Sequence, residues 1–500
     1  MKTEEKEDSY SHILKYTGIF GGVQGLNILM GVVRNKLVAL ILGPGGMGLI
    51  SLFNSSIKLL SDSTNLGISM SAVREISEAY STNDMEKARH AVKLIRVWSL
   101  ITAVTGAMLC IALSPLLNSW TFSWGEHTLH FMLLSPVVAA SAVTGGELAI
   151  LKGLRQLKHL AVISIYGIAG AIVTSIPLYL IWNESAIVPS LIIIALIQMA
   201  LTLAYSYRLF PPRLKNGRKL IAEGLGMVKL GVAFIMAGIL GSGAEFIIRS
   251  YLNNVGSLEV VGLYNAGFMI TMTYAGMVFQ AMETDFFPRL SAVKALGEKM
   301  NTIVNRQIEV SLLLVSPLLV FFIFGAPMLL PLLYSTKFIP VMGMLKLAII
   351  AMFFRAVTLP MEYISLARGR SGIYLFTEAV YDTMLVCAVI CGYRLWGLSG
   401  TGLAITATGA FNLLMVLIVS YRCYGYKPSA NVLRYIAIML PLGIASYIIT
   451  LTSESVAYWT LGVLMTLTTS AISFHTLRTK ADTDIIHIFR FGKRIHRNKN

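Results

Sequence analysis

Long apolar runs separated by short polar links account for almost the whole chain. About fourteen of these runs reach the roughly 20 residues that a helix needs to cross a lipid bilayer. The runs of the first half are 13–42, 49–73, 91–117, 129–151, 160–182 and 186–209. Those of the second half are 221–252, 260–287, 303–333, 341–366, 373–395, 400–421, 433–451 and 455–477. The pattern predicts an all-α polytopic membrane protein with about fourteen transmembrane helices.

Charged residues recur between the two halves of the chain at a constant separation. Arg34 and Arg74 of the first half return as Arg249 and Arg289, in both cases 215 residues later (249 − 34 and 289 − 74). A glycine-containing turn lies between the members of each pair. A repeat of this length predicts two pseudo-repeated six-helix bundles around a central cavity, followed by a C-terminal helix pair without a counterpart in the first half.

The double proline at 211–212, inside a strongly basic link, marks the boundary between the two halves. Six apolar runs precede it, and the remaining runs follow it. The predicted divisions of the chain are 1–210 for an N-terminal six-helix bundle, 211–220 for a cytoplasmic linker, 221–424 for a C-terminal six-helix bundle, 425–478 for an appended helix pair (spans 13 and 14) and 479–500 for a basic cytoplasmic tail.

The composition supports a membrane protein and excludes an ordinary soluble domain. Mean hydropathy is +0.70, and only 13% of the residues are charged, against roughly 25% in soluble domains. The net charge of +16 does not point to nucleic acid, because the lysines and arginines gather in alternate links rather than in one basic domain. This alternation follows the positive-inside rule and predicts that both termini are cytoplasmic.

Several charged residues lie inside the apolar runs, where insertion of one ionised side chain costs about 2.5–3.5 kcal/mol. Arg34, with Lys36 close by, and Arg355 have no opposite charge nearby in their own runs, which favours a place in a water-filled cavity. Arginine and lysine in such a cavity would bind a multiply charged anion, such as a phosphate or pyrophosphate. The candidate anion-binding residues are Arg34, Lys36, Lys58, Arg249 and Arg355.

The carboxylates inside the runs have two interpretations. Asp62 lies four residues after Lys58, and Glu245 lies four residues before Arg249, so each pair could form an ion pair on one helix face. Alternatively, these groups line the cavity, where carboxylates could release the anion or carry protons. The candidates for ion or proton coupling are Asp62, Glu147, Glu245 and Asp382. The sequence leaves both interpretations open.

Short motifs carry a family resemblance that covers nearly the whole chain. The motifs are Leu42-Gly43-Pro44 followed by Gly48, Leu66-Gly67-Ile68 followed by Arg74, and Trp396-Gly397-Leu398-Ser399-Gly400-Thr401-Gly402-Leu403-Ala404. Together with the repeat, they resemble bacterial polysaccharide transporters of the multidrug/oligosaccharidyl-lipid/polysaccharide flippase superfamily. Within that superfamily, the chain is most similar to the O-antigen translocases.

The resemblance implies a flippase in the bacterial plasma membrane. Such a protein moves undecaprenyl-pyrophosphate-linked oligosaccharide, an O-antigen or related repeat unit, from the inner to the outer leaflet by alternating access. The implied architecture is a V-shaped pair of six-helix bundles, in which the five cationic candidates would meet the pyrophosphate and acidic sugar groups. The resemblance further implies a monomer that works near a polysaccharide polymerase and glycosyltransferases.

Three other functions compete with this interpretation. A lipid II flippase of the same superfamily has fourteen helices, and its last two form a groove for the lipid tail. A multidrug or cation antiporter binds cationic substrates, for which a cavity rich in arginine and lysine has the wrong charge. A membrane-embedded polysaccharide polymerase or glycosyltransferase generally needs larger exterior loops than these short links. The sequence therefore predicts a transporter rather than an enzyme.

Histidine and cysteine do not form a convincing metal site in this sequence. His127 and His130 lie together near a predicted outer membrane boundary, which is more typical of interfacial residues than of metal ligands. Cys387 and Cys391 share a helical face in an apolar run, as core residues do. No metal and no other cofactor is therefore expected.

Overall fold

A computed structural model describes residues 4–81, 84–123, 125–211, 217–293, 296–452 and 455–497. Helices make up nearly all of these residues, and no strand occurs among them. Ten helical stretches of the described chain are long and apolar enough to cross a membrane, which confirms the predicted all-α polytopic fold. Two of them, 158–209 and 371–424, each contain two helical segments, and the number of about fourteen spans stays a prediction.

Some of the predicted features lie outside the described residues. These are residues 212–216 of the predicted linker and the side chains of Arg74 and of the tail beyond Thr479. The backbone of the tail continues the last helix as far as Arg497.

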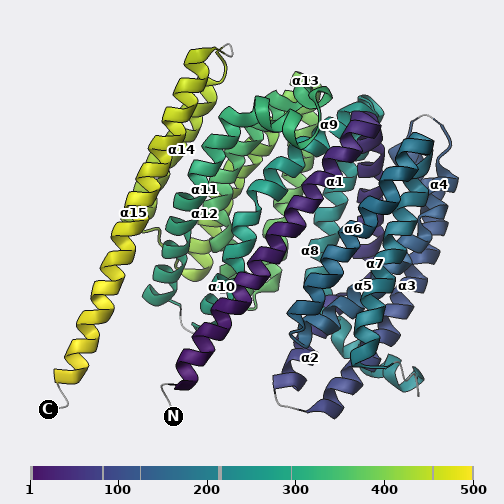
Figure 1. Ribbon diagram of the computed structural model, residues 1–500, viewed down its shortest axis with the longest axis horizontal. Helices are drawn as coiled ribbons and strands as arrows, with labels where there is room; N and C mark the ends of the chain where they lie inside the picture. The colour runs from purple at the N-terminus through teal and green to yellow at the C-terminus, as the bar shows by residue number, and fades with distance from the viewer. Residues whose placement is uncertain are drawn as a thin grey trace. The chain divides into compact units, whose positions relative to one another are not determined.

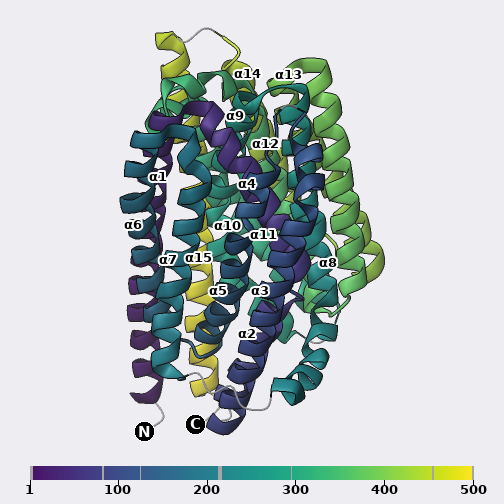
Figure 2. The ribbon, with the colours of Figure 1, turned by 90° about the vertical axis from the view of Figure 1, so that its right-hand side faces the viewer.

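The chain divides into two compact units, and the N-terminal unit comprises Met1–Leu263 together with Leu332–Lys337. Its elements are α1 (Glu4–Thr64), α2 (Ile68–Ser81), α3 (Met85–Thr121), α4 (Thr128–Leu133), α5 (Ser135–Gly153), α6 (Leu157–Trp182), the 3₁₀ turn η1 (Asn183–Ala186), α7 (Ile187–Leu209), α8 (Gly217–Val255) and the first part of α9 (Leu258–Phe268). Within this unit α3 packs on α5, α5 on α7, and α7 on α6 (Figures 1 and 2).

The C-terminal unit comprises Tyr264–Pro331 and Phe338–Asn500. After the rest of α9, its elements are the π-helical turn η2 (Met269–Ala275), α10 (Met277–Ala292), α11 (Glu298–Leu333), the 3₁₀ turn η3 (Thr336–Val341), α12 (Met342–Ala367), α13 (Ser371–Tyr424), α14 (Ala430–Ile449) and α15 (Val456–Arg497). Helix α12 packs along α13, α14 packs on α12, and α15 packs on α14 (Figure 1).

A buried aromatic side chain anchors α15 to the body of the C-terminal unit. The Tyr458 hydroxyl donates to the carbonyl of Phe324 in α11 at 2.8 Å. The ammonium group of Lys346 in α12 lies 5.4 Å from the centre of the Tyr458 ring, which is within the range of a cation–π interaction. The last two helices are therefore held by polar as well as apolar contacts.

The boundary between the two units lies within α9, after Leu263. It differs from the predicted linker at 211–220, because α8 packs against α1, α2 and α3. The predicted linker separates the halves of a sequence repeat, whereas the units are defined by packing. The two pseudo-repeated six-helix bundles around a central cavity stay a prediction.

Two breaks in long helices coincide with predicted links between membrane runs. In α1, Gly43 has φ +65° and ψ −169° and is followed by Pro44, so the helix bends between the predicted runs 13–42 and 49–73. This backbone conformation is readily accessible only to glycine. In α13, Trp396 and Gly397 leave helical geometry in the same way, between the predicted runs 373–395 and 400–421.

Three predicted runs are not continuous α-helices. The run 129–151 is divided at Leu134 between α4 and α5. The run 49–73 is interrupted at Leu66 and Gly67, whose φ angles of 49° and 65° are left-handed. The run 260–287 contains the π-helical turn η2. The prediction that each of these runs forms one continuous α-helix was therefore wrong. An apolar run shows that a segment is buried in lipid or protein. It carries little information on the φ and ψ angles of single residues.

Candidate functional site

Ionised side chains of α1 and α8 meet inside the N-terminal unit. Lys58 donates through Nζ to Glu245 Oε1 at 2.7 Å, and Arg249 donates through Nη1 to Glu245 Oε2 at 3.0 Å. Arg249 also donates through Nε to Ser51 Oγ at 2.8 Å, and only 6% of the residue is exposed. We call Ser51, Lys58, Glu245 and Arg249 the Glu245 cluster. In it, one carboxylate is shared by two cations.

Only one of the two ion pairs allowed by the sequence spacing forms. Glu245 pairs with Arg249 on the same helix, as one interpretation expected. Lys58 pairs with Glu245 on the neighbouring helix, and the Lys58–Asp62 pair that the spacing allowed is not formed. Asp62 lies beside Ser242 and within electrostatic reach of Lys58. Spacing along one helix could not show that α8 supplies the partner.

The C-terminal turn of α8 is tied to the end of α3. Asn253 Nδ2 donates to the carbonyl of Thr121, and Asn254 Nδ2 donates to the carbonyl of Trp120, both at 2.8 Å. The predicted topology places these residues at the outer side of the membrane. Carbonyls at the end of a helix have no partner within that helix, so the two asparagines complete the hydrogen bonding of α3.

Two glycines bring the backbones of α1 and α9 into direct contact. A Cβ atom at Gly48 would overlap the carbonyl of Leu258, and a Cβ atom at Gly262 would overlap the carbonyl of Pro44. We call this the glycine contact. Small residues of this kind allow transmembrane helices to approach closely. Any larger side chain at either position would force the two helices apart.

The two cations in the first part of α1 have different surroundings. Arg34 is half-buried and lies within electrostatic reach of Tyr179 in α6. Its Nε atom is buried and has no hydrogen-bond partner among the residues that the structure describes. Lys36 donates through Nζ to the carbonyl of Leu332 at the end of α11 at 2.8 Å. Arg34 therefore retains a buried donor, whereas Lys36 uses one of its donors to cap a helix.

Glu147 is held by an arginine that the sequence interpretation missed. Arg96 in α3 donates through Nε to Glu147 Oε1 at 2.8 Å and through Nη1 to the carbonyl of Phe210 at 2.7 Å. Ser206 in α7 donates to the second oxygen of the same carboxylate, and the Arg96 guanidinium lies 4.4 Å from the centre of the Tyr207 ring. Arg96 lies inside the apolar run 91–117, so the signal used for Arg34 would have identified it.

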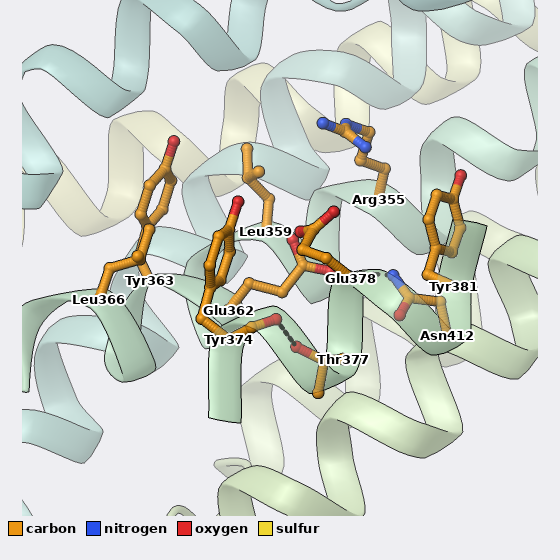
Figure 3. A pocket seen from close by; sticks show the side chains of 10 residues that line it. All are labelled: Arg355, Leu359, Glu362, Tyr363, Leu366, Tyr374, Thr377, Glu378, Tyr381 and Asn412. Atoms are coloured by element: carbon orange, nitrogen blue, oxygen red, sulfur yellow. Dashed lines mark hydrogen bonds between the residues drawn. The ribbon is translucent and has the colours of Figure 1, made fainter. Parts of the chain in front are cut away.

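A small cavity in the C-terminal unit collects carboxylates from α12 and α13. Its volume is about 190 Å³. Figure 3 shows the carboxylates of Glu362 and Glu378 next to each other, with Arg355 and Tyr381 at one side. Asn412 donates to Glu362 Oε1 at 2.9 Å. We call this space the carboxylate cavity.

The charge balance of the carboxylate cavity differs from the expectation for Arg355. The sequence interpretation gave Arg355 no nearby opposite charge, yet Glu362 lies two turns further along α12, and α13 contributes Glu378. Asp382, which is buried, lies within electrostatic reach of Glu378. Glu362 and Glu378 therefore line the cavity together with Arg355, and Asp382 is a neighbour of Glu378. The expectation of an Arg355 without a nearby opposite charge was wrong. Tyrosine and asparagine carry no charge, so the charge pattern of the sequence could not place Tyr381 or Asn412 here.

The sequence-predicted residues occupy separate places in the two units. The structure brings Lys58, Asp62, Glu245 and Arg249 together in the N-terminal unit, and Arg355 and Asp382 together in the C-terminal unit. Arg34, Lys36 and Glu147 each have different neighbours. Their roles in binding or coupling stay predictions.

A pair of histidines lies where α3 connects to α4 and α5. His127 Nδ1 and His130 Nδ1 are 3.1 Å apart, a distance that requires one nitrogen to donate and the other to accept. Burial, together with the neighbouring His130, lowers the pKa of His127. Across the described chain, no group of three or more histidine, cysteine, aspartate or glutamate residues could hold a metal ion.

Acidification is expected to loosen this histidine contact. Because the pKa of His127 is lowered in the folded protein, stability from the neutral pair is complete above the ordinary histidine pKa of about 6.5 and falls as the pH drops below it. Hydrogen exchange of residues 122–134, corrected for intrinsic rates, should rise between pH 7.5 and pH 5.5. A His127→Gln variant, which keeps a hydrogen-bonding side chain at the shifted position without a titrating group, should suppress this rise. Equal rises in both proteins would contradict the assignment.

Comparison with known proteins identifies the family. Residues 37–342, more than half of the chain, match the family described as polysaccharide biosynthesis protein. The chain belongs to this family. No curated protein matches this polysaccharide biosynthesis protein in sequence.

Solved structures show that this polysaccharide biosynthesis protein shares its fold with membrane transporters. An inward-facing multidrug resistance MATE family transporter of the MOP superfamily matches with a TM-score of 0.65 at 15% identity, over 80% of this chain and 94% of that chain. The lipid II flippase MurJ in an inward closed conformation matches with a TM-score of 0.63 at 15% identity, over 92% and 99%. A Vibrio cholerae MATE transporter gives 0.61 at 13% identity, over 83% and 96%. The fold of the superfamily named by the motifs is therefore confirmed.

Proposed function

We propose that this polysaccharide biosynthesis protein flips undecaprenyl-pyrophosphate-linked oligosaccharide from the inner to the outer leaflet of the bacterial plasma membrane by alternating access. The observation that carries the proposal is the cationic interior of the N-terminal unit. Arg249 is almost fully buried, and Arg34 keeps a buried Nε without a partner in the described chain. Membership of a polysaccharide biosynthesis family supports the pyrophosphate of a lipid-linked oligosaccharide as the anion that these cations bind.

In this proposal the cations of the Glu245 cluster exchange partners during transport. Without substrate, Glu245 holds Lys58 and Arg249. A pyrophosphate entering the cluster replaces the carboxylate, because its oxygens accept paired hydrogen bonds from a guanidinium and carry more charge. Release of the pyrophosphate lets Glu245 return. The ion pair thus lowers the cost of empty buried cations without blocking the site permanently.

Arg34 and Lys36 extend the binding surface of the N-terminal unit in this proposal, and Arg355 contributes from the C-terminal unit. Arg34 supplies its Nε donor, which has no hydrogen-bond partner in the described part of the chain. Lys36 uses one of its three N–H donors for the carbonyl of Leu332, so in this proposal it contributes its charge without leaving that carbonyl. The lipid tail stays in the bilayer while the head group crosses.

Two sets of contacts at the predicted outer ends of the helices close the outer side. They are the glycine contact and the hydrogen bonds of Asn253 and Asn254 with the end of α3. Release of the substrate to the outer leaflet requires both to separate. The same contacts reform when the protein returns for the next substrate.

The carboxylate cavity is the coupling site in this proposal. Of the four coupling candidates, Asp382 lies within electrostatic reach of Glu378, which lines the cavity with Glu362. An added proton or cation would relieve repulsion between these like charges. Asp62 and Glu245 are neighbours of the substrate cations. Glu147 is bonded to Arg96 and Ser206 and positions α3 against α5 and α7.

Loss of coupling is expected when the carboxylates of this cavity are neutralised. A Glu378→Gln or Asp382→Asn variant should translocate at the same rate with and without an imposed proton or sodium gradient. Occupancy of one coupled site typically changes the affinity of the other by roughly 5- to 150-fold. The translocation rate in the presence of the gradient should therefore decrease by a factor in that range. Glu298→Gln, an exposed change at the start of α11, serves as the control. A variant that keeps the full gradient dependence would contradict the assignment.

Leaflet-specific labelling in cells tests the proposed function. Cells deleted for the protein should accumulate lipid-linked oligosaccharide on the inner leaflet, and the wild-type protein should restore labelling outside. Normal crossing in the deletion strain would refute the proposal. A lipid II flippase is the second candidate, because the lipid II flippase fold covers 92% of this chain. Accumulation of lipid II rather than oligosaccharide would favour it.

The proposal also covers the oligomeric state, the partners, the orientation in the membrane and the need for a cofactor. The protein works as a monomer near a polysaccharide polymerase and glycosyltransferases, with both termini in the cytoplasm. It translocates substrate without changing covalent bonds, so it needs no cofactor.

A further inference from the structure

A second pocket lies at the predicted cytoplasmic end of the N-terminal unit. Its volume is about 780 Å³, which falls within the range of about 300–1,000 Å³ typical of ligand sites. The end of α2, the first turns of α3, the link between α5 and α6, and the end of α7 form its walls. We call it the α3 pocket. It shares no residue with the Glu245 cluster.

Two cations of α3 line this pocket without a partner among the residues that the structure describes. Arg89 and Lys93 both line it, and their spacing of four residues places them on one helix face. Neither makes a hydrogen bond or ion pair with any residue that the structure describes. Like charges at this spacing destabilise a helix, so a bound anion would stabilise this end of α3.

The other charged groups of the α3 pocket are largely compensated. Arg96 is bonded to Glu147, and His90 is 2.8 Å from Glu223. Of the described residues that line the pocket, Glu86 is the one that is acidic. Among the described residues that line the pocket, two cations therefore have no hydrogen-bond or ion-pair partner, and Arg96 is held by Glu147. One carboxylate, that of Glu86, opposes them.

Apolar side chains complete the walls of the α3 pocket. They include Val92, Leu154 and Leu209. A free inorganic anion would use none of this apolar surface, whereas a lipid headgroup brings a phosphate together with its glycerol and the first carbons of its acyl chains. Basic pockets between transmembrane helices on the cytoplasmic side bind anionic headgroups in this way.

We infer that the α3 pocket binds the phosphate-bearing headgroup of a lipid whose headgroup carries a net negative charge, with Arg89 and Lys93 as its phosphate ligands. The headgroup can come from an anionic phospholipid of the inner leaflet or from a lipid-linked pyrophosphate. The inference does not depend on which lipid the protein flips, because it rests on a pocket separate from the Glu245 cluster.

Binding of short-chain lipids to the purified full-length protein in neutral detergent tests this inference. The probes are dioctanoyl phosphatidylglycerol, dioctanoyl phosphatidylcholine and inorganic pyrophosphate. The variants are Arg89→Gln/Lys93→Gln and, as a matched control, Lys152→Gln/Lys158→Gln. The control removes two exposed charges near the same end of the unit that do not line the pocket.

The wild type should bind phosphatidylglycerol about 25-fold more tightly than phosphatidylcholine, since each of the two basic residues contributes about a factor of five. Arg89→Gln/Lys93→Gln should lose this preference, the control variant should keep it, and Glu86→Gln should bind phosphatidylglycerol more tightly. Competition by pyrophosphate would identify the phosphate as the recognised group, and absence of competition would show that the glycerol and acyl carbons are needed. Equal binding of both lipids, equal losses in both double variants, or binding of pyrophosphate alone would overturn the inference.

Discussion

Replacing Arg249 by methionine should lower the rate of oligosaccharide translocation by roughly 10- to 150-fold, with normal amounts of protein in the membrane. Hydrogen bonds to charged groups contribute about 1.5–3 kcal/mol, and Arg249 would supply at least one to the pyrophosphate. The arginine is almost fully buried, so water cannot take its place. Translocation into vesicles, normalised to the amount of folded protein, measures the effect.

The same substitution leaves Glu245 with Lys58 as its only remaining cation in the cluster, so stability must be separated from transport. Breaking a buried ion pair by removing one partner typically costs about 3–5 kcal/mol. Arg249→Met/Glu245→Gln removes both charges of that pair and should recover much of the thermal stability, while transport stays low. If the double variant regains transport, Arg249 serves packing alone and its binding role is wrong.

Introducing alanine at Gly48 should shift the protein away from the state in which its predicted outer side is closed. The added Cβ atom would overlap the carbonyl of Leu258, and overpacking of this kind typically costs about 1–3 kcal/mol. A cysteine at Val261, which is fully buried, reports the separation of α1 from α9. In a protein whose native cysteines are replaced by serine, a membrane-impermeant thiol reagent added outside should label this cysteine faster.

Gly45→Ala is the matched control for the glycine contact. It lies in the same turn, and a Cβ atom there would meet Glu184 only at an ordinary distance of 3.7 Å. It should leave both labelling and transport unchanged. Equal labelling in the Gly48→Ala and Gly45→Ala proteins would show that the glycine contact does not hold the outer side closed.

The fold was predictable because hydrophobic length decides whether a helix crosses a membrane. The link at Gly43 and Pro44 was also predictable, since both residues disfavour a continuous helix. The break at Leu66 was not, because leucine rarely adopts a positive φ and tertiary packing imposes it here. The packing of α8 against the N-terminal helices was equally hidden, because a linear pattern of apolar runs does not say which helices touch.

The candidate site was predictable only as a set of unusually placed charges. The cost of burying an ion singled out Arg249 and Glu245, and the structure places both in one cluster. It did not reveal that Lys58 reaches across to Glu245, because partners on other helices depend on three-dimensional packing. Uncharged members such as Ser51 and Asn412 carry no such signal, so sequence reasoning could not have found them.

The cations of the α3 pocket could not be recognised as candidate ligands from the sequence. Its cations lie at the start of a membrane run, where the positive-inside rule already accounts for basic residues. Arg89 and Lys93 therefore attracted no special interpretation in the sequence. Only the pocket between the helix ends, and the absence of partners for these two side chains within the described chain, sets them apart from other basic residues in the links.

Reconstitution of the purified protein into vesicles tests the central claim most directly. The vesicles contain a fluorescent short-chain polyprenyl-pyrophosphate oligosaccharide, and a glycosidase added outside reports how fast sugar from the inner leaflet appears on the outer surface. The account predicts protein-dependent transfer that Arg34→Ala and Arg249→Met both reduce strongly. Transfer no faster than in protein-free vesicles, or transfer unaffected by either arginine variant, would contradict it.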